Sequence, residues 1–271
     1  MNDGNGISPG DLGFVLDIDG VLHLDGAPIP GAADAVARLR RMGRLCFYTN
    51  VTASSRAARA ARLGELGIQA SPAEVLTASS VTASWLHERG IQRIQLLLIG
   101  SGRDEFADLD CDADEPEAVV MGELGETLRP ALLNRAFEAL LAGAQLVAMH
   151  KNRYWLNDGR RLLDVGAFVT ALEYASGRQA VVIGKPAPYG YQVALRLLNL
   201  PADQVAMVAD DLAIDLAGAG AVGLRAVLVE SGDYGPASAQ RGPRPDLTLP
   251  DITHLPEWLE RTGGRFTSKV K

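Results

Sequence analysis

The sequence of 271 residues has only two cysteines, Cys46 and Cys111, and no apolar run long enough to cross a bilayer. Nothing in the spacing of these two cysteines indicates a disulfide bond between them, so a reducing compartment is expected. The apolar run IQLLLIG is far shorter than the roughly 20 residues of a membrane-spanning helix. The first residues lack the basic and apolar regions of a secretion signal. These absences predict a cytoplasmic protein with no membrane partner.

The chain also lacks an excess of positive charge. It has 26 lysines and arginines against 33 aspartates and glutamates, a formal net charge of −7. This balance, without any basic stripe, argues against nucleic acid as a partner. With 47% hydrophobic and 22% charged residues, the chain has the composition of an ordinary globular protein. Its length suits one large domain, or a core with an inserted domain.

Short apolar runs alternate with alanine- and leucine-rich stretches along the chain. Strands are predicted at residues 14–19, 44–50, 179–185, 203–211 and 224–230, and helices at 31–42, 54–67, 188–199 and 211–219. This alternation predicts right-handed βαβ units and a Rossmann-like, mostly parallel sheet. The fold class is therefore α/β.

A second alternating set lies between about residues 79 and 180. Helices are predicted at 79–89, 129–142 and 165–176, and strands near 93–99, 117–121 and 145–149. These elements are enough for a separate α/β domain. We therefore predict a core of residues 1–78 plus 181–271 and an inserted α/β domain of residues 79–180. Tyr154 and Trp155 are predicted to pack inside the inserted domain.

Polar residues stand at or near the ends of four predicted strands. They are Asp17 with Asp19, Thr49 with Asn50, Lys185, and Asp210 with Asp211. In a parallel sheet such ends meet at one edge, where ligands bind. Crowded carboxylates would repel one another without a cation, and oxygen ligands suit Mg²⁺. A hydroxyl group and a lysine beside them would suit a phosphoryl group.

The spacing of Asp17 and Asp19 gives two carboxylates on the same face of a strand. One carboxylate can attack phosphorus, while the other protonates the leaving group and later activates water. The sequence therefore predicts phosphoryl transfer, where positioning and charge neutralisation do most of the work. A D-x-D pair alone is a weak signal, because acids at strand ends are often turn formers.

Taken in order, the segments DIDGVL, YTN, GKP and DDLAID resemble the four motifs of the haloacid dehalogenase superfamily. The domain inserted between the second and third motifs resembles the large α/β cap of its type IIA members. The resemblance covers roughly residues 12 to 262. It implies a phosphatase whose substrate is a small phosphoester, a phosphoramide or pyrophosphate. It also implies the cap as the surface through which a homodimer would form.

The resemblance implies a role for each acidic residue of the motifs. Asp17 would be the nucleophile and a Mg²⁺ ligand. Asp19 would be the general acid and base, with its backbone carbonyl on the metal. Asp210 would bind Mg²⁺ through its side chain. Asp211 and Asp215 would support the waters of the metal or the lysine of the third motif.

The resemblance assigns the phosphoryl oxygens to Thr49, to Asn50 through its backbone N–H, and to Lys185. Arg153 is a further substrate-binding candidate because it belongs to a basic cluster in the cap. This cluster consists of His150, Lys151, Arg153, Arg160 and Arg161. Either it is a solvated loop, or it closes over the leaving group of the substrate. One departure from the family pattern is Ala209, where a glycine usually precedes the fourth motif.

Other functions fit parts of this pattern. A phosphomutase would use the same two aspartates. Because Ala209 departs from the family pattern, a catalytically weak phosphatase-like binding protein is a further alternative. A dehalogenase needs neither a second aspartate nor a metal. A phospho-receiver domain carries its metal-binding acids before the phosphorylated aspartate and has no inserted domain. The segment GAGAVG fits a dinucleotide motif, but it follows a predicted helix and precedes a strand, the reverse of the required order.

Overall fold

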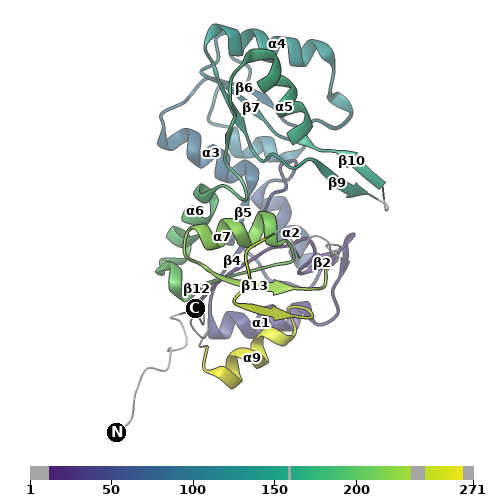
Figure 1. Ribbon diagram of the computed structural model, residues 1–271, viewed down its shortest axis with the longest axis vertical. Coiled ribbons are helices and arrows are strands. Elements are labelled where there is room, and N and C mark those ends of the chain that lie inside the picture. The colour runs from purple at the N-terminus through teal and green to yellow at the C-terminus, as the bar shows by residue number, and fades with distance from the viewer. Residues whose placement is uncertain (1–11, 158–159, 233–241, 265–271) are drawn as a thin grey trace. The chain divides into compact units, whose positions relative to one another are not determined.

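The computed structural model describes residues 12–157, 160–232 and 242–264 (Figure 1). The chain divides into two compact units, and each has a parallel sheet of its own. The first unit comprises residues 1–49, 60–76 and 191–271, and the second comprises residues 50–59 and 77–190. The predicted fold class, a Rossmann-like core with an inserted α/β domain, is confirmed. The exact domain boundaries, at residues 79 and 180, stay a prediction.

The first unit is built on a six-stranded sheet with the strand order β14-β13-β12-β1-β4-β5. The strands are β1 (Leu12–Leu16), β4 (Gly43–Thr49), β5 (Val75–Thr77), β12 (Val205–Ala209), β13 (Arg225–Val229) and β14 (Leu247–Leu249). The central strand β1 pairs in parallel with β12 and with β4. Leu16 lies opposite Val208 on one side and Phe47 on the other, so the carboxyl ends of the three strands lie close together.

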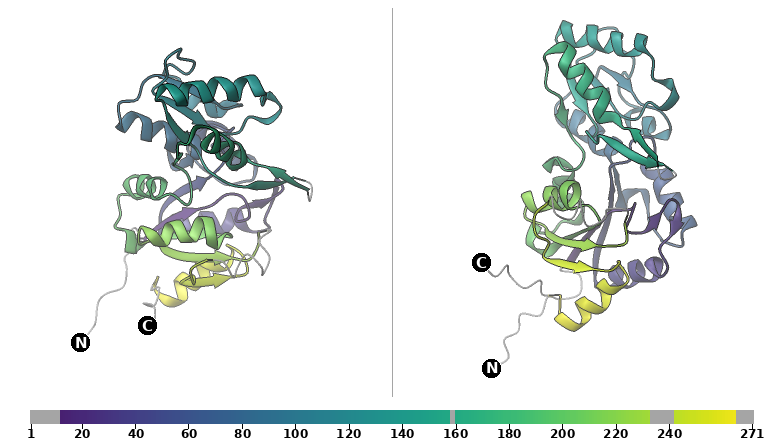
Figure 2. Two further views of the ribbon diagram at one scale, coloured as in Figure 1. Left: turned by 45° about the horizontal axis from the view of Figure 1, so that its top comes forward. Right: turned by 45° about the vertical axis from the view of Figure 1, so that its right-hand side comes forward.

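The helices of the first unit pack on a sheet whose central strands are buried along their length. They are α1 (Ala32–Met42), α7 (Ala217–Ala221) and α9 (His254–Thr262), with the larger parts of α2 (Arg56–Glu65) and α6 (Pro188–Leu198), whose first residues are assigned to the second unit. Helices α1 and α9 lie side by side on one face of the sheet, and α7 lies on the other (Figures 1 and 2). The core includes Phe14, Leu39, Phe47, Val208 and Leu255. Burial on both faces explains why β1 and β12 are continuous apolar runs.

A small hairpin follows β1 directly and was not predicted. It consists of β2 (His23–Leu24) and β3 (Ala27–Pro28), which pair antiparallel. Both turn residues, Asp25 and Gly26, have positive φ angles, 45° and 79°. Such angles are what a two-residue hairpin turn requires, and Asp-Gly is a favoured sequence for it. Arg62 of α2 donates a hydrogen bond to the carbonyl of Gly26 over 2.8 Å, which ties down the turn.

The second unit is built on a four-stranded parallel sheet with the order β11-β8-β7-β6. Its strands are β6 (Ile94–Leu97), β7 (Ala118–Met121), β8 (Gln145–Ala148) and β11 (Val181–Val182), and its helices are α3 (Ala78–Glu88), α4 (Pro130–Ala142) and α5 (Val165–Ser176). Its core joins these strands to α4 and α5 through residues such as Val119, Leu140 and Val169. Within the described residues, no helix of either unit is long and apolar enough to span a membrane.

The strand predicted at residues 179–185 differs from the structure in length and in partner. Only Val181–Val182 is a strand, and it pairs with β8 in the sheet of the second unit. The prediction placed this run in the core sheet because its apolar composition suits either sheet. Parallel pairing joins strands far apart in sequence, so composition alone does not identify the partner.

The prediction that Tyr154 and Trp155 pack inside the cap is wrong. They lie on β9 (Tyr154–Asn157), which pairs only with β10 (Arg160–Leu163) in the described structure, as a separate two-stranded sheet. Each of the two aromatic side chains is 45% exposed. The guanidinium of Arg161 lies 5.1 Å from the centre of the Tyr154 ring, a cation–π contact on the surface of the hairpin.

Glu173 on α5 makes the stability of the second unit depend on pH. Its carboxylate accepts hydrogen bonds from Lys151 Nζ, at 2.5 Å, and from the N–H of Ala180, at 3.0 Å. Burial alone would raise the pKa of Glu173, but these bonds outweigh it and hold the pKa below the usual value of 4.5. A depressed pKa stabilises the folded state above the unfolded value, and this contribution is lost as the pH falls through the folded value.

We therefore expect Glu173→Gln to lower the free energy of unfolding by about 1 kcal/mol at neutral pH. The difference from the native protein should shrink as the pH falls below 4.5 and should vanish once Glu173 is protonated in both states. Urea unfolding across this pH range measures it. Glu138→Gln, at an exposed position of α4, is the matched control and should change little. A cost of Glu173→Gln that is independent of pH would contradict the assignment.

Candidate active site

Three of the predicted site acids stand at the carboxyl edge of the first unit's sheet. Asp17 follows β1, and its backbone N–H donates to the carbonyl of Val208 on β12 over 2.9 Å. Asp210 and Asp211 follow β12 directly, and all three side chains are buried, at 7%, 9% and 6% exposure. Ala209, the departure from the family pattern, is fully buried and keeps its pairing with β13. The strand therefore accommodates the extra methyl group.

The carboxylate of Asp210 lies against the backbone at two glycines. A Cβ placed on either Gly20 or Gly232 would overlap the Asp210 carboxylate. The hydroxyl of Ser231 donates to the carbonyl of Gly20 over 2.7 Å, so the loop after β13 closes on the turn after β1. These contacts place Asp210 beside the turn that carries Asp19.

Asp19 differs from the other acids because its side chain is 55% exposed. One carboxylate oxygen, Oδ1, is 3.5 Å from Nε2 of His23. The other, Oδ2, is 3.5 Å from the hydroxyl of Thr49, which donates toward it. Thr49 is the last residue of β4 and is buried. The structure thus brings the predicted residues Asp17, Asp19, Thr49 and Asp210 to one edge of the sheet.

Asp211 caps the helical turn that follows β12. Its Oδ1 accepts hydrogen bonds from the N–H groups of Ala213, at 2.7 Å, and Ile214, at 3.0 Å. The turn, Leu212–Leu216, is π-type and replaces the start of the helix predicted at 211–219. Asp215 lies on this turn and is buried. Capping is a typical task for an aspartate at this position, and it fixes the backbone just beyond Asp210.

Tyr191 supports the same turn, and the sequence did not reveal it. Its hydroxyl donates to the backbone carbonyl of Asp215 over 2.8 Å, and its ring packs edge-to-face on Tyr48 with centroids 5.5 Å apart. Burial raises the pKa of Tyr191 far above its usual value, and the charges of Asp215, Asp17 and Asp211 raise it further. The phenol therefore stays protonated and donates. In the sequence, an aromatic residue in an apolar helix is indistinguishable from an ordinary core residue.

Asn50 and Lys185 belong to the second unit, where the side chain of Asn50 joins the two motifs. Its Oδ1 accepts from the N–H of Lys185 over 2.8 Å, and its Nδ2 donates to the carbonyl of Lys185 over 3.0 Å. Lys185 is buried. The Asn50 side chain thus fixes the backbone of the third motif, a role that the sequence did not suggest. The phosphoryl-binding roles of both residues stay predictions.

The basic cluster predicted in the cap carries less free charge than its sequence suggests. His150 is buried, and burial lowers its pKa despite the nearby charge of Asp164. Lys151 is paired with Glu173. The remaining members are exposed: Arg153, Arg160 and Arg161. The role of Arg153 in substrate binding stays a prediction.

The donor set of the first unit fits Mg²⁺. Among the described residues, no group of three or more His, Cys, Asp or Glu side chains is arranged to hold a metal ion. Mg²⁺ does not need such a cage, because it is usually bound by one or two carboxylates together with waters and substrate phosphates. The side chains of Asp17 and Asp210, with the carbonyl of Asp19, are oxygen donors of the kind that such a partial set would need. The glycine backbones packed on Asp210 restrict its carboxylate.

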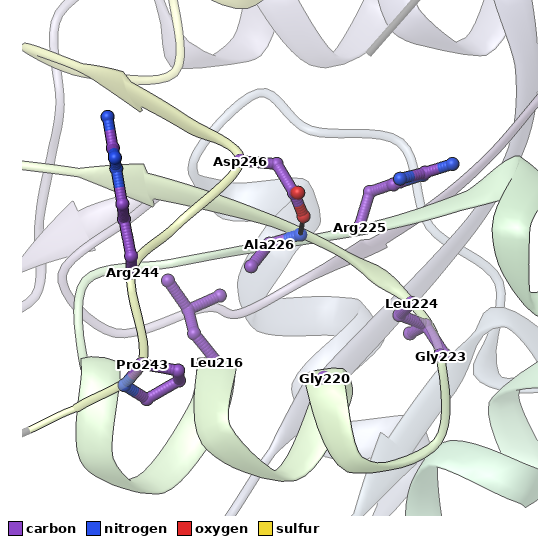
Figure 3. A pocket seen from close by; sticks show the side chains of 9 residues that line it. All are labelled: Leu216, Gly220, Gly223, Leu224, Arg225, Ala226, Pro243, Arg244 and Asp246. Carbon is purple, nitrogen blue, oxygen red and sulfur yellow. Dashed lines mark hydrogen bonds between the residues drawn. The ribbon is translucent and has the colours of Figure 1, made fainter. Parts of the chain in front are cut away.

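A separate pocket of about 210 Å³ lies in the first unit (Figure 3). Arg225 and Ala226 line it at the start of β13, and Arg244 and Asp246 line it just before β14. Asp246 accepts a hydrogen bond from the N–H of Ala226 over 2.8 Å. The pocket therefore lies at the amino edge of the parallel sheet, whereas the acids follow the carboxyl edge.

Known proteins resemble this chain along most of its length. A family model described as haloacid dehalogenase-like hydrolase matches residues 14–111, and one described as HAD-hydrolase-like matches residues 182–255. Phospholysine phosphohistidine inorganic pyrophosphate phosphatase of Rattus norvegicus is 38% identical over 84% of this chain and 86% of its own. Haloacid dehalogenase-like hydrolase domain-containing protein 2 of Mus musculus is 35% identical over 89% of this chain and 92% of its own. The solved p-nitrophenyl phosphatase from Archaeoglobus fulgidus superposes with a TM-score of 0.86 at 28% identity, covering 93% of this chain and 100% of that one.

Fold and site together define an α/β protein with an inserted domain and with acids gathered at the carboxyl edge of its core sheet. The chain belongs to the haloacid dehalogenase-like hydrolase family. The resemblance predicted from the four motifs is confirmed.

The close approach of Gly20 to Asp210 predicts a large cost for any side chain at position 20. Gly20 has a φ of 78°, and an added Cβ would overlap the Asp210 carboxylate. Gly20→Ala should therefore lower the free energy of unfolding by about 2 kcal/mol or more. Gly64→Ala is the matched control, because a Cβ there has open space on α2 and should stabilise by up to about 1 kcal/mol. Equal unfolding midpoints of the two variants would contradict this packing.

Proposed function

We propose that this protein is a Mg²⁺-dependent phosphatase that hydrolyses a small phosphorylated substrate through an aspartyl-phosphate on Asp17. The substrate class comprises phosphoesters, phosphoramides and pyrophosphate. The observation that carries the proposal is the convergence of Asp17, Asp19 and Asp210 at one edge of the core sheet. Relatives that are named phosphatases support it.

In the first step, the carboxylate of Asp17 attacks the phosphorus atom. A bond forms between Asp17 and phosphorus while the bond from phosphorus to the leaving group breaks. Asp19 begins protonated and gives its proton to the leaving group as the bond to phosphorus breaks, so the group departs with one negative charge fewer than it would otherwise carry. The different surroundings of the two acids support this division, since Asp17 is buried and Asp19 is exposed to the solvent.

In the second step, Asp19 takes a proton from a water molecule while the water oxygen attacks phosphorus. The bond between phosphorus and Asp17 breaks, and inorganic phosphate leaves. Asp17 is again a carboxylate and Asp19 is again protonated, so the cycle is closed. A phosphomutase would use the same acid to activate a substrate hydroxyl in place of water, so release of inorganic phosphate is the outcome that distinguishes a hydrolase from a mutase.

The side chains of Asp17 and Asp210 and the backbone carbonyl of Asp19 would hold the Mg²⁺ ion. When bound, the ion neutralises charge on the carboxylates and on the phosphoryl oxygens. Asp211 would act through its cap on the turn, by holding the backbone beyond Asp210. Asp215, on the same turn, would assist this arrangement.

The proposal also includes ligands for the phosphoryl oxygens. Thr49 is assigned on its position at the end of β4, beside Asp19. Asn50 and Lys185 are assigned on their motifs, as a backbone donor and a positive charge. Arg153 is kept as a ligand for the leaving group, because its side chain is exposed in the cap.

The decisive test is phosphate release from a panel of phosphorylated metabolites, pyrophosphate and an aryl phosphate, with and without Mg²⁺. Asp17→Asn should lower kcat by at least about 10³-fold, because the nucleophile is lost. Asp25→Asn is the matched control, since Asp25 is exposed on the hairpin turn and Asn also adopts positive φ. It should keep the native rate.

Full turnover by Asp17→Asn would reject the mechanism. If the native protein releases phosphate from no member of the panel, the phosphatase proposal fails and the phosphatase-like binding protein replaces it. Circular dichroism of both variants must match the native protein for the comparison to hold.

A further inference from the structure

His23 is a buried histidine that the four motifs do not explain. It lies on β2, four residues after Asp19, and its side chain is only 8% exposed. Within the described part of the chain, neither ring nitrogen has a hydrogen-bond partner at bonding distance. Leaving a buried polar group unpaired costs on the order of 1–3 kcal/mol. Buried polar groups are usually hydrogen-bonded, so an acceptor within reach of the His23 ring is expected.

The Asp19 carboxylate is the acceptor within reach. Nε2 of His23 is 3.5 Å from Oδ1 of Asp19, a few tenths of an ångström beyond a good hydrogen bond. Thr49 stands at 3.5 Å from Oδ2 on the other side. The carboxylate thus lies between a buried ring nitrogen and a buried hydroxyl group. Catalytic hydrogen bonds are often long in a free enzyme and shorten when the substrate binds.

The backbone around His23 is held firmly, so the exposed Asp19 is the partner that can adjust. The N–H of Gly20 donates to the carbonyl of His23 over 2.8 Å, and the N–H of Leu22 donates to the carbonyl of Ile18 over 2.9 Å. Pairing of β2 with β3 and the bond from Arg62 to the hairpin turn fix the other end. The backbone that carries the His23 ring is therefore fixed by hydrogen bonds on both sides, and the ring lies beside Asp19.

We propose that His23 is a positioning residue for Asp19, the general acid and base. Its Nε2–H donates to Oδ1 of Asp19 and leaves Oδ2 as the oxygen that carries the transferred proton. His23 itself neither gains nor loses a proton in the reaction. This inference rests on the proposed phosphatase function and adds to it the residue that decides which oxygen of Asp19 reacts.

The test compares two substrates that depend differently on a general acid. Glycerol phosphate must expel an alkoxide and needs its proton, whereas p-nitrophenyl phosphate expels a stable phenolate. The ratio kcat/KM reports events up to transfer of the phosphoryl group to Asp17. His23→Leu should lower kcat/KM for glycerol phosphate by about 10- to 100-fold and for p-nitrophenyl phosphate by less than about 3-fold. A merely structural role would lower both equally.

Conservative variants show whether the position of the N–H matters. His23→Gln can place an amide N–H near the position of Nε2 and should restore most of kcat/KM for glycerol phosphate. His23→Asn places its amide nearer the position of Nδ1 and should not. If thermal unfolding shows that His23→Leu does not fold, the comparison of His23→Gln with His23→Asn still tests the inference.

A double variant separates action through Asp19 from an independent effect. Asp19→Asn should show the same preference for the aryl substrate, and adding His23→Leu to it should lower kcat/KM no further. Equal losses on both substrates, additive losses in the double variant, or indistinguishable Gln and Asn variants would overturn the inference. If the native protein releases phosphate from no member of the panel described above, the proposed function fails and the inference with it. If it acts on other members but on neither of these two, the same comparison uses the hydrolysed members with the most and the least basic leaving groups. If the native protein is active and the substrate ratio is unchanged, only the role of His23 is rejected.

Discussion

The parallel pairing of β1 with β12 is the constraint on which the candidate site depends. The register Leu16↔Val208 makes two buried strands end at the same edge, so Asp17 and Asp210 leave the apolar sheet together. Carboxylates gathered in this way repel each other. The backbone packs directly on the Asp210 carboxylate at Gly20 and Gly232, where no side chain would fit. A cation shared by the acids, as proposed, would remove the remaining repulsion.

Much of the fold could be predicted because its central strands are buried on both faces. Such strands are continuous apolar runs, and the stretches between them have helical composition. The prediction was wrong where the position of an element depends on contacts with residues that are distant in the sequence. The run at 179–185 is apolar in either sheet, yet its two-residue strand pairs with β8. Tyr154 and Trp155 have the composition of core residues, but their hairpin forms a sheet of its own and leaves them half exposed.

The site was predictable as far as it rests on residues at strand ends. Asp17, Asp19, Thr49 and Asp210 follow from their positions and from the order of the motifs, and the structure brings them to one edge. The residues that brace this edge were missed for a physical reason. Tyr191 acts through tertiary contacts, as His23 is proposed to do, and a single histidine or tyrosine within an apolar stretch has no characteristic spacing. The capping role of Asp211 did have a local signal, since an aspartate before a helical turn is a common cap.

The central claim is that Asp17 receives a phosphoryl group beside a cation held jointly with Asp210. A crystal structure of the protein with Mg²⁺ and fluoroberyllate, which mimics a phosphoryl group on a carboxylate, tests it most directly. We expect beryllium to be bonded to the Asp17 carboxylate. We also expect Mg²⁺ at about 2.1 Å from oxygens of Asp17 and Asp210 and from the Asp19 carbonyl. Fluoroberyllate on another residue, or Mg²⁺ bound away from both aspartates, would contradict the claim.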